Sequence, residues 1–212
     1  MAPALARLSE QLALGSTPEQ CDALLRFVAL LQRWNATYNL TAVREPAQML
    51  TRHIADCLAA VPALRRHLAG ANGRRLLDVG SGGGLPGVVF AILHPELAVT
   101  CVDTVGKKAA FVRQVAVELG LRNLASEHAR VEKLKAPPFD LIASRAFASL
   151  ADFASLTRPL LAPTGVWLAM KGKRPDDEIA ALSDSIAVFH VEPINVPGMD
   201  AERCLVWMRR RA

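Results

Sequence analysis

The sequence is poor in cysteine and in aromatic residues, and both shortages narrow the class of protein. Its four cysteines lie far apart, without a Cys-x-x-Cys pair, so neither a metal site nor a disulfide framework is expected. Reduced, buried thiols in a cytoplasmic protein are the expected alternative. Aromatic residues make up 5% of the chain, so each ring is expected to serve the core or helix packing first.

Long apolar runs are missing as well. The longest uncharged stretch, residues 79–95, contains five glycines and two prolines, which excludes a membrane-spanning helix there. The first 15 residues carry Arg7 and Glu10 within the region that a signal peptide would keep apolar. We therefore expect no secretory signal and no membrane partner.

What is present is enough apolar material for a core. Of the 212 residues, 51% are hydrophobic and 21% are charged, which excludes wholesale disorder. The length fits one domain with a helical extension, and we expect a monomer. The net charge of +5 is compatible with a polyanionic partner.

The chain divides into two regions that differ in their pattern of apolar residues. Residues 1–72 are predicted to form a helical extension or cap, with a capping box at residues 17–20 and a break at residues 44–46. The loop at residues 70–73 is the expected boundary, and residues 73–212 form the second region.

The second region alternates between short apolar runs and helical patterns. This alternation predicts an α/β protein of the Rossmann-like class, with a mostly parallel sheet covered on both faces. The predicted helices are residues 86–94, 106–119, 149–161 and 175–186. The seven predicted strands are residues 75–79, 98–102, 123–128 (the weakest pattern), 139–143, 165–170, 187–196 and 202–209. The last two are joined by a turn at residues 197–198, too short for a crossover helix, so they should form a C-terminal antiparallel pair.

A glycine-rich turn after the first strand is the strongest binding signal. Gly80, Gly82 and Gly84 allow a backbone with positive φ that approaches a ligand closely. Asp103 ends the next strand, where a carboxylate can accept both hydroxyls of a ribose. Together they predict a ligand that contains adenosine.

Two ligands fit this pattern. The letters Gly82-x-Gly84-x-x-Gly87 match the dinucleotide fingerprint. Asp78, two residues before the first glycine, would repel a pyrophosphate and instead suits a ligand with a cationic end. S-adenosyl-L-methionine has an ammonium, a sulfonium and an adenosine, and the spacing Asp78-x-Gly80-x-Gly82-x-Gly84 is typical of the first motif of methyltransferases that use it.

Several further segments, spread over residues 18–209, resemble one family. They are RWNATYNLT at 33–41, RHIAD at 52–56, the turn at 78–87, DTVGKK at 103–108, SRAFASL at 144–150, Lys171-Gly172 and Glu202-Arg203-x-Leu205. By these motifs the chain resembles the RsmG family, also called glucose-inhibited division protein B. One departure is Gly83, where a relative has proline, and little effect is expected from it.

The resemblance implies a class I methyltransferase fold and a reaction. The family methylates guanine N7 in bacterial 16S rRNA, at guanine 527 near the decoding site, with S-adenosyl-L-methionine as cofactor and S-adenosyl-L-homocysteine as product. The partner would be 16S rRNA in the small ribosomal subunit or in an assembly intermediate. The cofactor-binding residues implied, together with those predicted from the glycine turn, are Asp78, Gly80, Gly82, Gly84, Leu85, Asp103, Val131, Glu132 and Arg145.

Other candidate residues concern the RNA. Because guanine N7 carries a lone pair and no proton, we expect no catalytic acid or base. The candidates for the substrate pocket are Arg145, His53, Asn39 and Lys171. The candidates for contact with RNA are Lys107, Lys108, Arg113 and Arg203. Base stacking on Trp34, Tyr38 or Phe147 is a further possibility.

Purely structural alternatives stay open for these side chains. Arg145 could pair with Asp140 or Asp152, and Asn39 could cap a helix. At the level of function, two alternatives remain: a methyltransferase that acts on a small molecule or a protein, and a nucleotide-binding module without catalysis.

Overall fold

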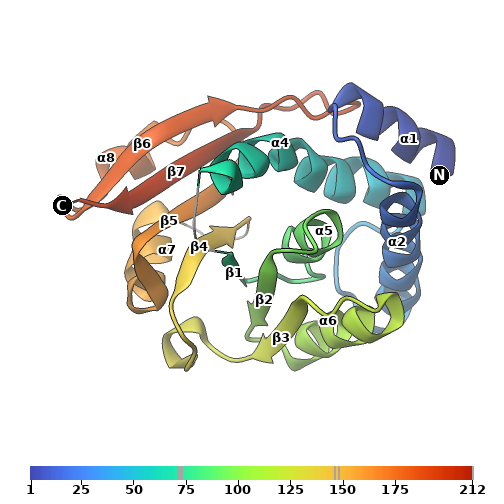
Figure 1. Ribbon diagram of the computed structural model, residues 1–212, viewed down its shortest axis with the longest axis horizontal. Coiled ribbons are helices and arrows are strands. Elements are labelled where there is room, and N and C mark those ends of the chain that lie inside the picture. The colour runs from blue at the N-terminus through green and yellow to red at the C-terminus, as the bar shows by residue number, and fades with distance from the viewer. Residues whose placement is uncertain (71–73, 146, 148, 212) are drawn as a thin grey trace.

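The protein is a seven-stranded sheet with helices on both faces (Figure 1). The computed structural model describes residues 1–70, 74–145, 147 and 149–211. Most of the predicted boundary loop, residues 71–73, lies outside the described residues. The strands are β1 (Arg75–Val79), β2 (Ala98–Asp103), β3 (Leu124–His128), β4 (Phe139–Ser144), β5 (Leu161–Lys171), β6 (Ile186–Pro193) and β7 (Cys204–Arg210). The α-helices are α1 (Ala2–Gln11), α2 (Pro18–Tyr38), α3 (Pro46–Met49), α4 (Ala55–Ala69), α5 (Gly87–Leu93), α6 (Gly106–Leu119), α7 (Leu150–Thr157) and α8 (Asp176–Ala180).

The strand order is β3-β2-β1-β4-β5-β7-β6. Strands β1 to β5 run parallel to one another, whereas β7 is antiparallel to both β5 and β6. The predicted seven-stranded, mostly parallel sheet with a C-terminal antiparallel pair is therefore confirmed. The chain order reverses between β1 and β4, and ligands of such sheets bind outside the carboxyl ends of the strands at that point.

Alternate residues of each strand enter two separate cores. Leu76 faces the core that contains α2, α4, α5 and α6, and Leu77 faces the core under α7. In the first core, Phe27 of α2 stacks on Phe111 of α6 with ring centroids 6.3 Å apart. The N-terminal helices thus complete the cover of one sheet face (Figure 1).

Two predicted helices are shorter in the structure. The helix predicted for residues 149–161 ends as α7 at Thr157, because Pro159 lacks an N–H; a 3₁₀ turn (Arg158–Leu160) follows and β5 begins at Leu161. The helix predicted for residues 175–186 ends as α8 at Ala180. Its second half is a turn in which Ile186 N donates to Ser183 O, since Ser and Asp favour turns over helix.

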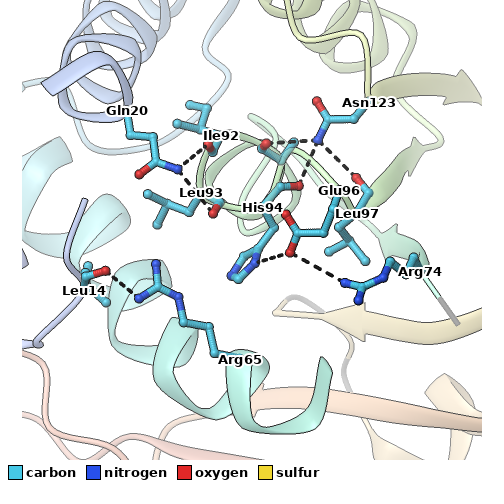
Figure 2. Close-up of polar contacts among 11 residues, drawn as sticks. Leu14, Gln20, Arg65, Arg74, Ile92, Leu93, His94, Glu96, Leu97 and Asn123 are labelled. Atoms are coloured by element: carbon cyan, nitrogen blue, oxygen red, sulfur yellow. Dashed lines mark hydrogen bonds and ion pairs between the residues drawn. The ribbon is translucent and has the colours of Figure 1, made fainter. Parts of the chain in front are cut away.

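The C-terminal end of α5, away from the glycine turn, is closed by side-chain amides (Figure 2). Asn123 Nδ2 donates to the carbonyl oxygens of Ala91, His94 and Leu97, at 3.0 to 3.1 Å. Gln20 Nε2 reaches Ile92 O at 3.3 Å and Leu93 O at 3.4 Å. These donors satisfy carbonyl groups that lack intrahelical partners at the end of α5, and the carbonyl of Leu97 in the turn that follows.

The predicted capping box at the start of α2 is present. Thr17 Oγ1 accepts from Gln20 N, and Gln20 Oε1 accepts from Thr17 N. We expect Thr17→Ala to lower the free energy of unfolding by about 1 kcal/mol, measured by urea denaturation. Gln20→Ala should cost more, because it also removes the bonds to Ile92 and Leu93. Equal stability of Thr17→Ala and the parent protein would contradict this account.

Candidate functional site

The glycine turn after β1 has the backbone that its sequence predicts. Gly80, Gly82 and Gly84 have φ of +68°, +56° and +80°. Gly80 N and Ser81 N both donate to Val102 O, at 2.9 and 3.3 Å. The turn is therefore hydrogen-bonded to the carboxyl end of β2, the strand beside it.

Asp103 joins this turn to the next one. Its Oδ2 accepts from Gly82 N at 2.9 Å, and its Oδ1 accepts from Val105 N at 2.8 Å. Each carboxylate oxygen keeps a second lone pair for another donor. The carboxylate thus holds the glycine turn in place. Its contact with a ribose stays a prediction.

Asp78 lies beneath the same turn and is fully buried. Its Oδ2 accepts from Gly87 N at 2.8 Å, at the start of α5, while its Oδ1 is buried without a hydrogen-bond partner among the described residues. Burial raises the pKa of Asp78 to about 7. An acceptor oxygen left unpaired in this way is costly.

The remaining predicted cofactor residues also lie at or beside this edge of the sheet. Leu85 is buried at the end of the glycine turn. Val131 and Glu132 start a 3₁₀ turn (Val131–Lys133) soon after β3, with Val131 buried and Glu132 exposed. Arg145 follows β4 directly.

A cavity of about 910 Å³ opens beside Arg145. Its wall comes from a π-helical turn (Leu50–Ile54), from α4, from the ends of β4 and β5, and from the connection between β6 and β7. The described residues that line it include Gln48, Thr51, Arg52, His53, Asp56, Arg145, Met170, Lys171, Met199, Asp200 and Arg203. Its lining is rich in cationic and polar side chains.

Arg145 is held by an acid that sequence reasoning did not assign to it. Its Nη1 lies 3.3 Å from Asp56 Oδ2, on α4. The alternative pairing with Asp140 or Asp152 is wrong, because Asp140 accepts from Arg75 N and Asp152 bonds to Ser149 at the start of α7. Burial disfavours the charged form of Arg145, but nearby groups, Cys57, Asp56 and Asp78 among them, raise its pKa. Arg145 therefore lines the cavity and also interacts electrostatically with Asp78, the acid beneath the glycine turn.

His53 and Lys171 both line the cavity with defined partners. His53 Nε2 lies 2.7 Å from Thr41 Oγ1, and burial together with the charge of Arg145 lowers the pKa of His53. Lys171 Nζ lies 2.8 and 3.0 Å from the two carboxylate oxygens of Glu178, and donates to Phe147 O as well. The cationic form of His53 is thus disfavoured, and Lys171 is already paired with a carboxylate.

Some predicted residues lie elsewhere. Asn39 does not line the cavity; it is exposed and ends α2 in the left-handed conformation, at φ +49°. Lys107, Lys108 and Arg113 lie on α6, away from the lining, whereas Arg203 is in it.

The three candidate stacking rings differ in exposure. Trp34 packs on Phe111 of α6, with ring centroids 5.5 Å apart, and Phe147 packs on Phe153 of α7, at 5.4 Å. Tyr38, which contacts Trp34, is 43% exposed. Trp34 and Phe147 therefore take part in packing between elements.

Sequence reasoning missed the residues that support the cavity. Asn35 is buried and bridges the loop before α3, accepting from Thr41 N at 2.8 Å and donating to Val43 O at 2.9 Å. Asn35 and Thr41 both belong to the segment RWNATYNLT, so their motif was noticed but not their roles.

Two features are absent from the described part of the chain. Within it, no helix is both long and apolar enough to cross a lipid bilayer. Nor do its His, Cys, Asp and Glu side chains gather in groups of three that could hold a metal ion. The four cysteines are free thiols.

The fold is shared with proteins of known structure. TrmN from Thermus thermophilus superposes with a TM-score of 0.57 at 22% identity, over 76% of this chain and 53% of that one. The ribosomal protein L11 methylase from Lactobacillus delbrueckii gives a TM-score of 0.56 at 17% identity, over 73% and 78% of the two chains. Sheet order and these likenesses define a class I methyltransferase fold.

The sequence narrows the class to a family. The family described as rRNA small subunit methyltransferase G matches residues 20–206. The ribosomal RNA small subunit methyltransferase G of Acidovorax sp. (strain JS42) is 60% identical, over 97% of this chain and 94% of its own. The chain belongs to the rRNA small subunit methyltransferase G family.

Proposed function

We propose that this protein transfers a methyl group from S-adenosyl-L-methionine to N7 of a guanine in 16S rRNA. The observation that carries the proposal is the polar cavity lined by Arg145 and Arg203, since Arg145 also interacts electrostatically with Asp78 beneath the glycine turn. The target expected from the family resemblance is guanine 527, within the small ribosomal subunit or an assembly intermediate. We propose further that the protein acts as a monomer in the cytoplasm.

The residues around the glycine turn suit this cofactor. The buried Oδ1 of Asp78 lacks a hydrogen-bond donor among the described residues, and Asp103 has lone pairs to spare. A ligand with a cationic end and sugar hydroxyls supplies what both acids can accept, whereas a pyrophosphate would face the charge of Asp78. When bound, S-adenosyl-L-methionine supplies an electrophilic methyl group on a sulfonium.

The work left to the protein is mainly positioning. Guanine N7 has a free lone pair, so no side chain needs to remove a proton before attack. This agrees with a cavity whose histidine, His53, has a pKa lowered by burial and bonds to Thr41. Holding two reactants in line can lower a barrier by roughly 7–11 kcal/mol in favourable systems.

The arginines of the cavity would read the base and its phosphate. Guanine presents O6 and N7 as acceptors on one edge. A donor bonded to N7 would occupy the lone pair that attacks, so useful donors are those that bind O6 or a phosphate oxygen. Arg145 and Arg203 are donors of that kind.

The direct test is to incubate the protein with methyl-labelled S-adenosyl-L-methionine and small-subunit rRNA, and to measure the masses of the RNA fragments by mass spectrometry. We expect one added methyl group in the fragment that contains guanine 527. The matched control is an RNA with 7-deazaguanine at that position, which lacks N7 and should accept none. Methylation of the control, or of protein alone, would refute the proposal.

Asp103→Ala should weaken cofactor binding. Loss of the ribose acceptor and of the bond to Gly82 is expected to weaken the binding free energy of S-adenosyl-L-methionine by about 1.5–3 kcal/mol, which raises its Kd roughly 10- to 150-fold. Isothermal titration calorimetry measures it. Asp140→Ala, which removes an acid that bonds to Arg75 N at the start of β1, should leave the Kd unchanged. An unchanged Kd in Asp103→Ala would mean that the acid has no part in cofactor binding.

A further inference from the structure

One carboxylate in the cavity wall holds two arginines. Asp56 is the second residue of α4, just after the π-helical turn, and is 4% exposed. Its Oδ2 lies 3.3 Å from Arg145 Nη1, and its Oδ1 lies 3.0 Å from Arg203 Nε. The partners are 89 and 147 positions away in the chain, so three distant segments meet at this acid.

The arrangement keeps both arginines at the cavity without using up their donors. A guanidinium has five N–H groups, and each arginine gives one of them to Asp56. Arg203 gives another, from Nη1, to the carbonyl of Glu202. The side chains remain 24% exposed for Arg145 and 29% for Arg203.

Stability alone is a poor reason for such a cluster. The cost of desolvating a buried carboxylate and two cations offsets much of their attraction, so an apolar replacement is often as stable. What the cluster supplies in addition is a fixed geometry, because both oxygens of one rigid acid set the direction of two flexible side chains.

We propose that Asp56 is the positioning residue of this site, fixing Arg145 and Arg203 as a pair of cationic donors that grip the nucleotide presented for methylation. The inference rests on the proposed function and extends it to the substrate side. Arg145, at the end of β4 and next to the glycine turn, faces the base and binds guanine O6. Arg203, on the connection before β7, binds a phosphate oxygen of the RNA backbone.

The chain offers a matched control for the structural part of this role. Glu192 on β6 also ties α4 to the C-terminal hairpin, through Arg66 Nη2 at 2.6 Å, and accepts from Trp207 Nε1 at 3.2 Å. Unlike Asp56, it does not belong to the described lining of the cavity. Glu192→Gln therefore removes a carboxylate that also joins α4 to the C-terminal strands, and leaves the arginine pair in place.

The test compares Asp56→Asn with Glu192→Gln in the labelled-methyl assay. We expect Asp56→Asn to raise the KM for rRNA by about tenfold or more, with the Kd for S-adenosyl-L-homocysteine changed by less than about threefold. Glu192→Gln should keep the KM for rRNA within about twofold, even where its Tm falls equally. Equal KM changes in the two variants would overturn the inference while leaving the proposed function intact.

A second variant keeps the test decisive if Asp56→Asn does not fold. Arg203→Gln leaves the pair of Asp56 and Arg145, and should raise the KM for rRNA and lower the salt dependence of RNA binding by about one phosphate contact. Unchanged KM and salt slope would refute the assignment. If the parent protein methylates no RNA, the proposed function fails and this inference fails with it.

Discussion

Asp78→Asn is expected to make the protein more stable at pH 8 by up to about 4 kcal/mol, and to have little effect near pH 4. Asp78 is fully buried, and burial raises its pKa from its ordinary value to about 7. A shift of about three pKa units corresponds to about 4 kcal/mol. An asparagine oxygen can still accept from Gly87 N, so the start of α5 keeps its partner.

The sign follows from proton binding. Between about pH 4 and pH 7 the folded protein keeps the proton of Asp78, whereas the unfolded chain releases it. The folded state therefore binds more protons, and the parent protein loses this part of its stability as pH rises through that range. The asparagine variant has no such loss.

Urea denaturation of both proteins at pH 5, 6, 7 and 8 measures this effect. The difference between the two free energies of unfolding cancels the contribution of groups that they share, and it should grow from pH 5 to about pH 7 and level off towards pH 8. A difference that stays constant from pH 5 to pH 8 would contradict the argument. A cationic ligand near Asp78 would lower its pKa, so the proposed cofactor should bind more tightly as pH rises through 7.

Gly84→Ala is expected to destabilise the protein by about 2–5 kcal/mol. Gly84 has φ of +80°, and a Cβ built on it would lie 2.4 Å from Val88 Cγ2 and 3.2 Å from Val112 Cγ2. The left-handed backbone costs roughly 1–2 kcal/mol for a residue with a side chain. The overlap with Val88 adds about 1–3 kcal/mol, because the first turn of α5 must move.

Gly82→Ala separates the two causes. Gly82 also has positive φ, at +56°, but a Cβ there would lie 4.0 Å from its nearest neighbour, Gly80 O. Only the backbone cost of about 1–2 kcal/mol is expected for it. Equal destabilisation of the two variants in chemical denaturation would show that the overlap at Gly84 is relieved without cost.

Local patterns were enough to predict most of the fold. Helix α6 has the predicted bounds, residues 106–119, because its apolar residues recur at helical spacing and Gly120 ends it in the left-handed conformation. The positive φ of the glycine turn was likewise predictable, since only glycine adopts it without strain. The two shortened helices show where a pattern continued past a proline or a serine-rich turn.

The support of the cavity was not predictable in this way. Asp56 and Arg203 are 147 positions apart, and the local sequence around either residue does not predict that it pairs with the other. Similarly, Asn123 closes the end of α5 from the start of β3 through three bonds that depend on tertiary packing. Contacts of this kind arise from the folded topology and leave no periodic trace in the sequence.

The position of β7 has a consequence for how the chain is made. β7 is synthesised after β5 and β6, yet it lies between them in the sheet. Until residues 204–210 leave the ribosome, β6 has no neighbour and the apolar strand β5 presents an open edge, which is prone to pair with other chains. Nascent chains that stall before residue 204 should therefore aggregate, although they already contain every glycine of the turn.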